Sequence, residues 1–148
     1  MTPFAECVIE TCVHIGTFHI SDVLEFESVF SSNELTNLGD IVYFMLFDGK
    51  VVKVGLTTNM TKRKSGYTNN MNCKTTQRVI RVAKQYNIPH VEVYALQVPR
   101  ITNTITSFFS GIQYNESISQ LKKQENIYIA EAEKAGETLI FNNQKVNS

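Results

Sequence analysis

Four side chains between residues 43 and 67 have the types and spacing needed for chemistry. Tyr43 lies in one apolar run, Lys53 lies in the next, and Arg63 and Tyr67 follow four residues apart. A phenol can exchange a proton, and the two cations can neutralise negative charge. Taken singly, Tyr43 could be a core tyrosine with a bonded hydroxyl, and Lys53 an edge-strand lysine that blocks aggregation. Their occurrence together favours a functional site.

The two apolar runs predict a β-hairpin. The run 41–47 is β-rich, Asp48-Gly49 favours a turn, and 50–55 returns as the partner strand. A two-residue turn with regular pairing would direct Tyr43 and Lys53 to opposite faces. A three-residue loop with Gly49 in a bulge would place them directly opposite each other on one face. A shared site therefore requires a bulge.

The rest of the chain predicts helices around this hairpin. We expect helices near 3–14 and 22–30, a short helix beginning at Asn59 or Thr61, a helix from Thr75 or Thr76 to Tyr86, and a helix over 117–134 that Gly136 ends. We also expect a strand over 90–98, a polar surface loop over 99–116 and a short strand at 138–141. This pattern predicts an α+β fold: a small domain with a central, mainly antiparallel three-stranded sheet flanked by helices, plus an N-terminal helical extension.

Charge is distributed unevenly along the chain. Residues 1–49 hold eight acidic side chains and no Lys or Arg, whereas 50–84 hold nine basic side chains and no Asp or Glu. Such a basic segment indicates a polyanion-binding surface, although a solvated helix face neutralised by the acidic segment is the alternative. The predicted DNA-binding side chains are Lys62, Lys64, Lys74, Arg78, Arg81 and Lys84.

Composition narrows the class of protein. A length of 148 residues with 43% hydrophobic residues fits one globular domain, and no apolar run is long enough to span a membrane. We expect no signal peptide, because Glu6 and Glu10 interrupt the first apolar residues and no basic residue precedes them. We expect a cytoplasmic protein, because three cysteines without C-x-x-C spacing suit reduced thiols. A zinc site from Cys7, Cys12, His14 and His19 is disfavoured, since their spacing matches no established zinc pattern.

The hairpin and the following helix resemble the GIY-YIG nuclease family. The resemblance lies in "IVY", a twelve-residue step from Tyr43 to Gly55, then "KVG", "LTTN" and Arg63. A small subset of type II restriction endonucleases is most similar, with lysine in the second motif, tyrosine four after the arginine, a strand like "HVEVYA" and a glutamate followed by asparagine in a late helix. The resemblance covers residues 39–134, which sets a nuclease domain at 39–148 after an acidic extension at 1–38.

The resemblance implies a metal-dependent DNA endonuclease. Tyr43 would be the general base, with Lys53 beside it to favour the phenolate. Arg63 would stabilise charge on the phosphate, and Tyr67 would hydrogen-bond a phosphate oxygen. Glu125 would bind one divalent ion, Mg²⁺ or Mn²⁺. The implied partners are double-stranded DNA and a second copy of the chain, since a double-strand break needs two active sites.

Glu125 is the best placed of the acidic residues near the late helix. Leu121, Glu125, Tyr128 and Ala132 share one helical face, so Glu125 should point inward. An inward carboxylate needs a partner or a metal. Glu116, Glu131 and Glu133 are the alternatives, of which Glu131 and Glu133 should face solvent.

Two other functions are compatible with the sequence. The chain could be a DNA-binding module on a nuclease-like fold that no longer cuts, or an interaction protein whose acidic segment mimics nucleic acid. Within the nuclease interpretation, a site-specific restriction enzyme and a low-specificity phage endonuclease are equally open. Base contacts would come from the polar segments 65–77 and 98–117, which are rich in Asn, Thr and Gln.

Overall fold

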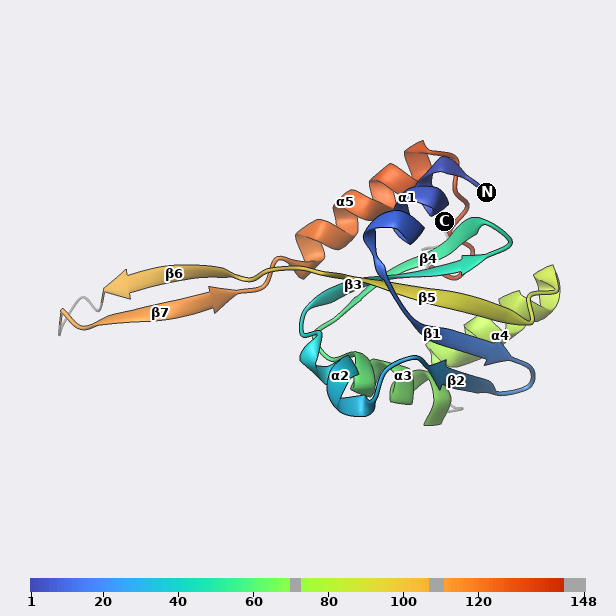
Figure 1. Ribbon diagram of the computed structural model, residues 1–148, viewed down its shortest axis with the longest axis horizontal. Coiled ribbons are helices and arrows are strands. Elements are labelled where there is room, and N and C mark those ends of the chain that lie inside the picture. Colours follow the sequence, from blue (N-terminus) through green and yellow to red (C-terminus); the bar gives the residue numbers. More distant parts are fainter. Residues whose placement is uncertain (70–72, 107–110, 143–148) are drawn as a thin grey trace.

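The chain folds around a central antiparallel sheet with helices on both faces (Figure 1). The computed structural model describes residues 1–69, 73–106 and 111–142. Its elements are α1 (Pro3–Thr11), β1 (Val13–Ile20), β2 (Leu24–Ser28), α2 (Ser32–Asn37), β3 (Ile41–Phe47), β4 (Lys50–Thr57), α3 (Met60–Asn69), α4 (Lys74–Tyr86), β5 (His90–Gln97), β6 (Ile101–Thr106), β7 (Gln113–Ile118) and α5 (Leu121–Lys134). The strand order is β2-β1-β5-β3-β4. The α+β class and the mainly antiparallel sheet are thereby confirmed.

Two apolar layers hold the helices to the sheet. Helices α1 and α5 cover one face, and α2, α3 and α4 cover the other (Figure 1). Ala5 of α1 and Leu121 of α5 pack with the even-numbered residues of β3, such as Phe44. Met60 of α3 packs on the opposite face with the odd-numbered residues of β3. The tyrosine at position 43 therefore faces α3. None of the helices in these described residues has the length and apolar character needed to cross a membrane.

The turn between β3 and β4 has two residues. Asp48 and Gly49 both have positive φ, 51° and 72°, and Phe47 pairs with Lys50 across them. Asp-Gly suits this geometry because aspartate tolerates the left-handed region and glycine enters it freely. The three-residue loop with Gly49 in a bulge was therefore the wrong expectation.

A bulge occurs farther along, at Val52. The register between β3 and β4 shifts between Leu46 and Met45. Beyond the shift, Met45 pairs with Lys53, and Tyr43 pairs with Gly55. The direct pairing of Tyr43 with Lys53 is thus wrong, but the two residues do share a face, since Tyr43 and Met45 are two apart on one strand. The extra residue, Val52, brings Lys53 to the face that holds Tyr43, but it lies inside β4 and not at the turn, where the bulge is expected.

The C-terminal segment covers the free edge of β4. The amide of Phe141 donates to the carbonyl of Val52 at 3.0 Å. The side chain of Asn142 accepts from the amide of Val54 at 3.0 Å and donates to its carbonyl at 3.1 Å. Residues 138–141 do not form the expected strand, but these bonds occupy an edge that would otherwise be open to another chain.

The N-terminal extension is only partly helical. The helix expected near 3–14 exists as α1 but ends at Thr11, because β1 begins at Val13; Thr2 caps it, its hydroxyl accepting from the amide of Ala5 at 3.2 Å. The helix expected near 22–30 is wrong, because β2 occupies this region and pairs with β1, which joins the sheet beside β5. Phe18 and Phe26 pair across these strands with ring centroids 4.7 Å apart. The sheet consequently has five strands instead of three.

The polar segment 99–116 is not the expected surface loop. Strands β6 and β7 pair with each other and project from the body as a two-stranded arm (Figure 1), while residues 107–110 lie outside the described part. Because β7 runs to Ile118, α5 begins at Leu121 instead of 117. At the root of the arm, Nη1 of Arg100 donates to both carboxylate oxygens of Asp40 at 3.1 Å, directly before β3.

Candidate active site

Tyr43, Arg63 and Tyr67 form one hydrogen-bonded cluster. The two tyrosine hydroxyls lie 3.1 Å apart, Nε of Arg63 donates to the Tyr43 oxygen at 3.2 Å, and Nη2 donates to the Tyr67 oxygen at 3.2 Å. The guanidinium also lies over the Tyr67 ring, 4.5 Å from its centroid. The arginine therefore orients both phenols at once, as its fork of donors allows.

Local structure sets these three positions. The helix α3 begins just after Asn59, whose side chain accepts from the amide of Lys62 at 3.2 Å, so Arg63 lies in its first turn. Tyr67 follows one turn later, buried, with its ring 5.3 Å from that of Phe18 on β1. Burial of this face therefore holds the Tyr67 hydroxyl against the sheet.

The cluster stabilises the charge of Arg63. Burial alone would lower the pKa of this arginine, but the hydroxyls of Tyr43 and Tyr67 outweigh that effect and raise it. For Tyr67, burial raises the pKa well above the usual value, the neighbouring Tyr43 adds to this, and Arg63 offsets only part of it. The guanidinium is thus held as a permanent cation over neutral Tyr67.

Lys53 lies on the same face but does not bond to Tyr43. Its residue is 7% exposed, and no hydrogen bond joins its ammonium to a tyrosine among the described residues. Burial, then the charges of Arg63 and Arg78, lower the pKa of Lys53 from 10.5 to about 8, and Glu125 opposes this. The expected cation beside Tyr43 is therefore supplied by Arg63, while Lys53 lies among several charges.

Glu125 points inward, as its helical face predicted. Its side chain is 13% exposed, and it accepts from the exposed ammonium of Lys122 at 3.0 Å. Glu131 and Glu133 of the same helix are exposed, and so is Glu116 on β7. The charge of Glu125 raises the pKa of Lys53, although α5 lies on the opposite face of the sheet from α3 and α4.

Glu125 fits a magnesium ion better than a zinc ion. Within residues 1–69, 73–106 and 111–142 there is no group of three His, Cys, Asp or Glu that could hold a metal. Mg²⁺ keeps several waters and is commonly bound by one or two carboxylates together with substrate phosphate. One inward carboxylate that already attracts an ammonium is a donor set of this kind. His14 and His19 are instead paired with Glu92 and Glu27.

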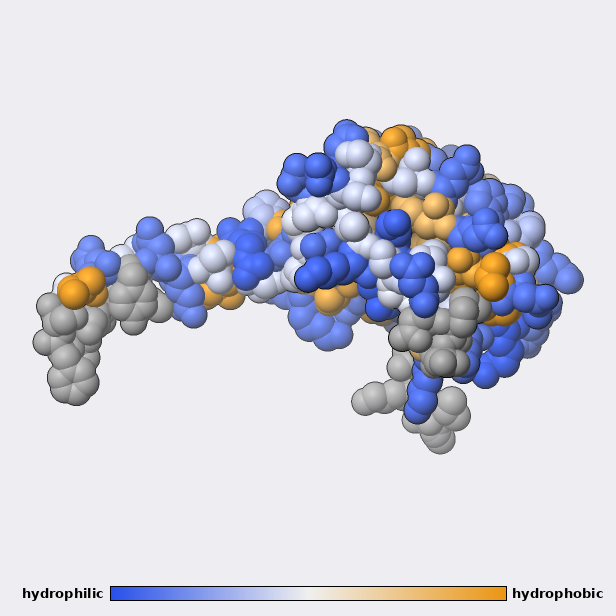
Figure 2. Space-filling view, turned by 90° about the horizontal axis from the view of Figure 1, so that it is seen from below, coloured by the Kyte–Doolittle hydropathy of each residue, from blue (hydrophilic) through white to orange (hydrophobic). Residues whose placement is uncertain are grey.

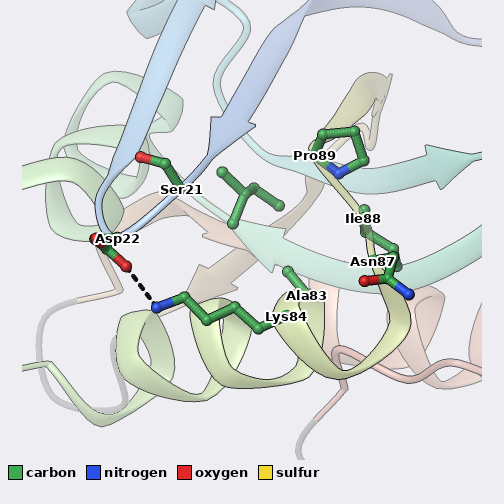
Figure 3. A pocket seen from close by; sticks show the side chains of 8 residues that line it. Ser21, Asp22, Ala83, Lys84, Asn87, Ile88 and Pro89 are labelled. Carbon is green, nitrogen blue, oxygen red and sulfur yellow. Dashed lines mark hydrogen bonds and ion pairs between the residues drawn. The ribbon is translucent and has the colours of Figure 1, made fainter.

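The predicted DNA-binding cations lie on α3 and α4. Figure 2 views the molecule from the side of these helices and shows mostly hydrophilic surface there. Lys62, Lys74 and Arg81 are exposed. Lys84 is paired with Asp22 beside a surface pocket lined by Ile88 and Pro89 (Figure 3). Lys64 and Arg78 are half-buried, and Arg78 faces the interior, so the six side chains do not form one uniform stripe.

Two contacts of the site have no sequence signal. Nη2 of Arg78 donates to the carbonyl of Phe141, 63 residues away. Asn142 holds Val54, which lies between Lys53 and Gly55. No local pattern announces either contact, because both depend on where the C-terminal segment returns to β4.

The fold is shared with two solved structures. A mutant of bacteriophage T4 EndoII superposes with a TM-score of 0.59 and 18% sequence identity, covering 86% of this chain and 92% of that chain. The restriction endonuclease HPY188I in complex with product DNA superposes with a TM-score of 0.53 and 22% identity, covering 98% of this chain and 87% of that chain. The sequence matches no protein-family model and no curated protein. The likeness establishes that the chain shares its mixed α+β fold with these two proteins.

Proposed function

We propose that this chain is a metal-dependent endonuclease of the GIY-YIG type that hydrolyses phosphodiester bonds in double-stranded DNA. The observation that carries this is the cluster of Tyr43, Arg63 and Tyr67 on the face that also holds Lys53. A structural relative that is a restriction endonuclease bound to product DNA adds support. A structural tyrosine pair would need no arginine and no buried lysine beside it.

In the proposed reaction, Tyr43 acts as its phenolate and takes a proton from the attacking water while the water oxygen bonds to phosphorus. The bond from phosphorus to the leaving deoxyribose oxygen breaks, and that oxygen takes a proton from solvent. Nε of Arg63 donates to the Tyr43 oxygen at 3.2 Å and so stabilises negative charge there. Nη1 of Arg63 makes no hydrogen bond within the described residues and is available to a phosphate oxygen.

Glu125 would hold the Mg²⁺ or Mn²⁺ ion. When bound, the ion would polarise the phosphate and neutralise charge on the leaving oxygen. The exposed Lys122 ammonium, which now pairs with Glu125 at 3.0 Å, can turn to solvent at little cost. The carboxylate then becomes available to a divalent ion.

The DNA would run across α3 and α4 towards the β6–β7 arm. The basic side chains proposed to contact phosphates along this path are Lys62, Lys64, Lys74, Arg81 and Lys84. A two-stranded ribbon fits the major groove of DNA, so we place base contacts in the arm. Cutting both strands would use two copies of the chain, one active site for each strand.

Plasmid cleavage tests this function. Purified protein is incubated with supercoiled plasmid and with phage DNA, in Mg²⁺ and in EDTA, beside Glu125→Ala and the control Glu131→Ala, an exposed carboxylate of the same helix. We expect Mg²⁺-dependent cutting that Glu125→Ala abolishes and Glu131→Ala retains.

The products distinguish the remaining possibilities. Discrete fragments would establish a site-specific enzyme, and a smear would establish a low-specificity one. Absence of cutting by wild-type protein that still binds DNA in a salt-dependent way would overturn the proposal in favour of a non-catalytic module.

A further inference from the structure

Arg78 differs from the other cations of α4 in where its side chain lies. Arg81 and Lys84 are exposed, and Lys84 reaches Asp22. Arg78 is half-buried, and its Nη2 donates to the carbonyl of Phe141 at 3.2 Å. It therefore points towards the sheet, away from the surface on which a general DNA-binding cation would lie.

The contact with Phe141 places the Arg78 guanidinium beside the bulge of β4. The amide of Phe141 donates to the carbonyl of Val52 at 3.0 Å, and Val52 directly precedes Lys53. Charge agrees with this placement, because Arg78 and Arg63 both act on Lys53, with burial the larger effect on its pKa. Cations from β4, α3 and α4 thus converge on one face of the molecule.

This convergence is unfavourable in the protein alone. Three like charges repel one another, and Glu125 is the one opposite charge that acts on Lys53 within the described residues. In addition, Nε of Arg78 is buried and has no hydrogen-bond partner in that part of the chain. Buried unsatisfied donors are rare in folded proteins, and an absent ligand is one of their explanations. An anion bound at this face would relieve the repulsion among the three cations.

We propose that Arg78 is a further phosphate-binding residue of this site, whose guanidinium holds a non-bridging oxygen of a DNA backbone phosphate beside Lys53 and Arg63. This rests on the proposed nuclease function. The bond from Nη2 to the carbonyl of Phe141 fixes the plane of the guanidinium. Arginine suits this task because its donors are held in a rigid plane.

The first test follows Arg78 in the unaltered protein. Inorganic phosphate is titrated into metal-free, ¹⁵N-labelled protein while the arginine Nε–H signals are recorded by NMR. We expect the Arg78 signal to shift with saturation, while that of Arg100, which already bonds Asp40 and Ser117, stays in place. An Arg78 signal that does not respond would overturn the proposal.

The second test uses DNA. Arg78→Gln should lower kcat/KM for plasmid cleavage by about 10- to 100-fold, the effect of losing a charge-assisted hydrogen bond, and reduce the salt dependence of DNA binding by about one phosphate contact. Arg78→Lys keeps the charge without Nε and should fall between Arg78→Gln and wild type. Lys134→Gln, an exposed lysine at the far end of α5, is the control. Wild-type kcat/KM and salt dependence in Arg78→Gln would overturn the proposal.

The two tests separate this inference from the function on which it rests. If wild-type protein cuts no DNA but its Arg78 signal responds to phosphate, the nuclease proposal fails and the anion site is supported. If the protein cuts DNA, but the Arg78 signal does not respond to phosphate and Arg78→Gln behaves like wild type, the nuclease proposal stands and this inference fails. Circular dichroism of each variant establishes that it is folded before either comparison is made.

Discussion

The ring of Tyr43 lies directly over the α-carbon of Gly55 on the neighbouring strand. A Cβ at Gly55 would come within 2.4 Å of Cζ and 2.5 Å of the hydroxyl oxygen of Tyr43. No flexible tip could move aside, because Tyr43 is 1% exposed and its hydroxyl is bonded to Arg63 and Tyr67. The ring of Tyr43 therefore fits only because residue 55, the glycine of "KVG", has no side chain.

Gly55→Ala should disable the site by displacing Tyr43. We expect a loss of stability of roughly 1–3 kcal/mol from overpacking and a fall in cleavage rate of at least 100-fold, because the Tyr43 hydroxyl would leave Arg63. Urea denaturation and single-turnover cleavage measure the two effects. Gly66→Ala is the control: nothing lies within 4 Å of its Cβ position, and alanine in helix α3 should raise stability by up to about 1 kcal/mol. Equal behaviour of the two variants would contradict this account.

Lys53→Met should make the folded protein more stable at neutral pH. A pKa of about 8 instead of 10.5 means that the charged lysine costs the folded state up to roughly 3 kcal/mol, so we expect a gain of about 1–3 kcal/mol at pH 7. Between about pH 8 and 10.5 the unfolded chain holds a proton that the folded protein has released, so wild-type stability rises with pH. The gain from Lys53→Met should therefore shrink over this window.

Urea denaturation in EDTA at pH 7 and at about pH 10 measures this change. The charges that face Lys53 from the packed elements are Arg63 on α3, Arg78 on α4 and Glu125 on α5. Lys50→Met, an exposed lysine of the same strand, should have no effect at either pH. A gain that is the same at both pH values would show that the charge of Lys53 is not what destabilises the fold.

The sequence predicts an element of this fold well where the residues that determine it are close together in the chain. Asp48-Gly49 and the apolar run before it fix the β3–β4 hairpin within a few residues of chain, so that prediction is confirmed. Phe26, by contrast, fits a helix through its spacing from Val23 and a strand through its alternation with Leu24. Pairing with Phe18 decides in favour of a strand, and this partner is a tertiary fact that no local pattern contains.

The candidate site was predictable to the same degree. Tyr43, Arg63 and Tyr67 come together because the hairpin and the helix that follows it are contiguous in sequence. The bulge was expected at Gly49, but the Asp-Gly turn closes with two residues, so the extra residue is Val52. The inward direction of Arg78 depends on the carbonyl of Phe141, which reaches it only after the C-terminal segment returns to β4.

Tyr67→Phe should weaken catalysis without dismantling the fold. The ring keeps its contact with Phe18, while Arg63 and Tyr43 lose one hydrogen-bonded oxygen, at a cost of about 1 kcal/mol in stability. Loss of one electrostatic contact should lower the single-turnover cleavage rate by roughly 10- to 100-fold. Tyr43→Phe should abolish cleavage, and Tyr94→Phe, a half-buried tyrosine on β5, should retain it. Full activity in Tyr67→Phe would remove this residue from the site.

Shortening the β6–β7 arm should change where DNA is cut more than whether it is cut. Thr102 pairs with Ser117, so an Asn-Gly turn in place of residues 103–116 closes the ribbon there and retains the bonds from Arg100 to Asp40 and Ser117. The arm lies outside the apolar core, so stability should stay within about 1 kcal/mol of wild type.

Sequencing of the fragment ends measures the effect of this shortening. Each lost base contact removes about 1–3 kcal/mol of discrimination, so a discrete set of cut positions should spread into many, while total phosphodiester hydrolysis falls less. The double variant of Thr104 and Asn115 to alanine, which removes a side-chain bond of 3.2 Å on the intact ribbon, should produce a smaller spread. Cut positions identical to those of wild type in the shortened protein would show that base recognition lies elsewhere, in the residues of α3 and α4.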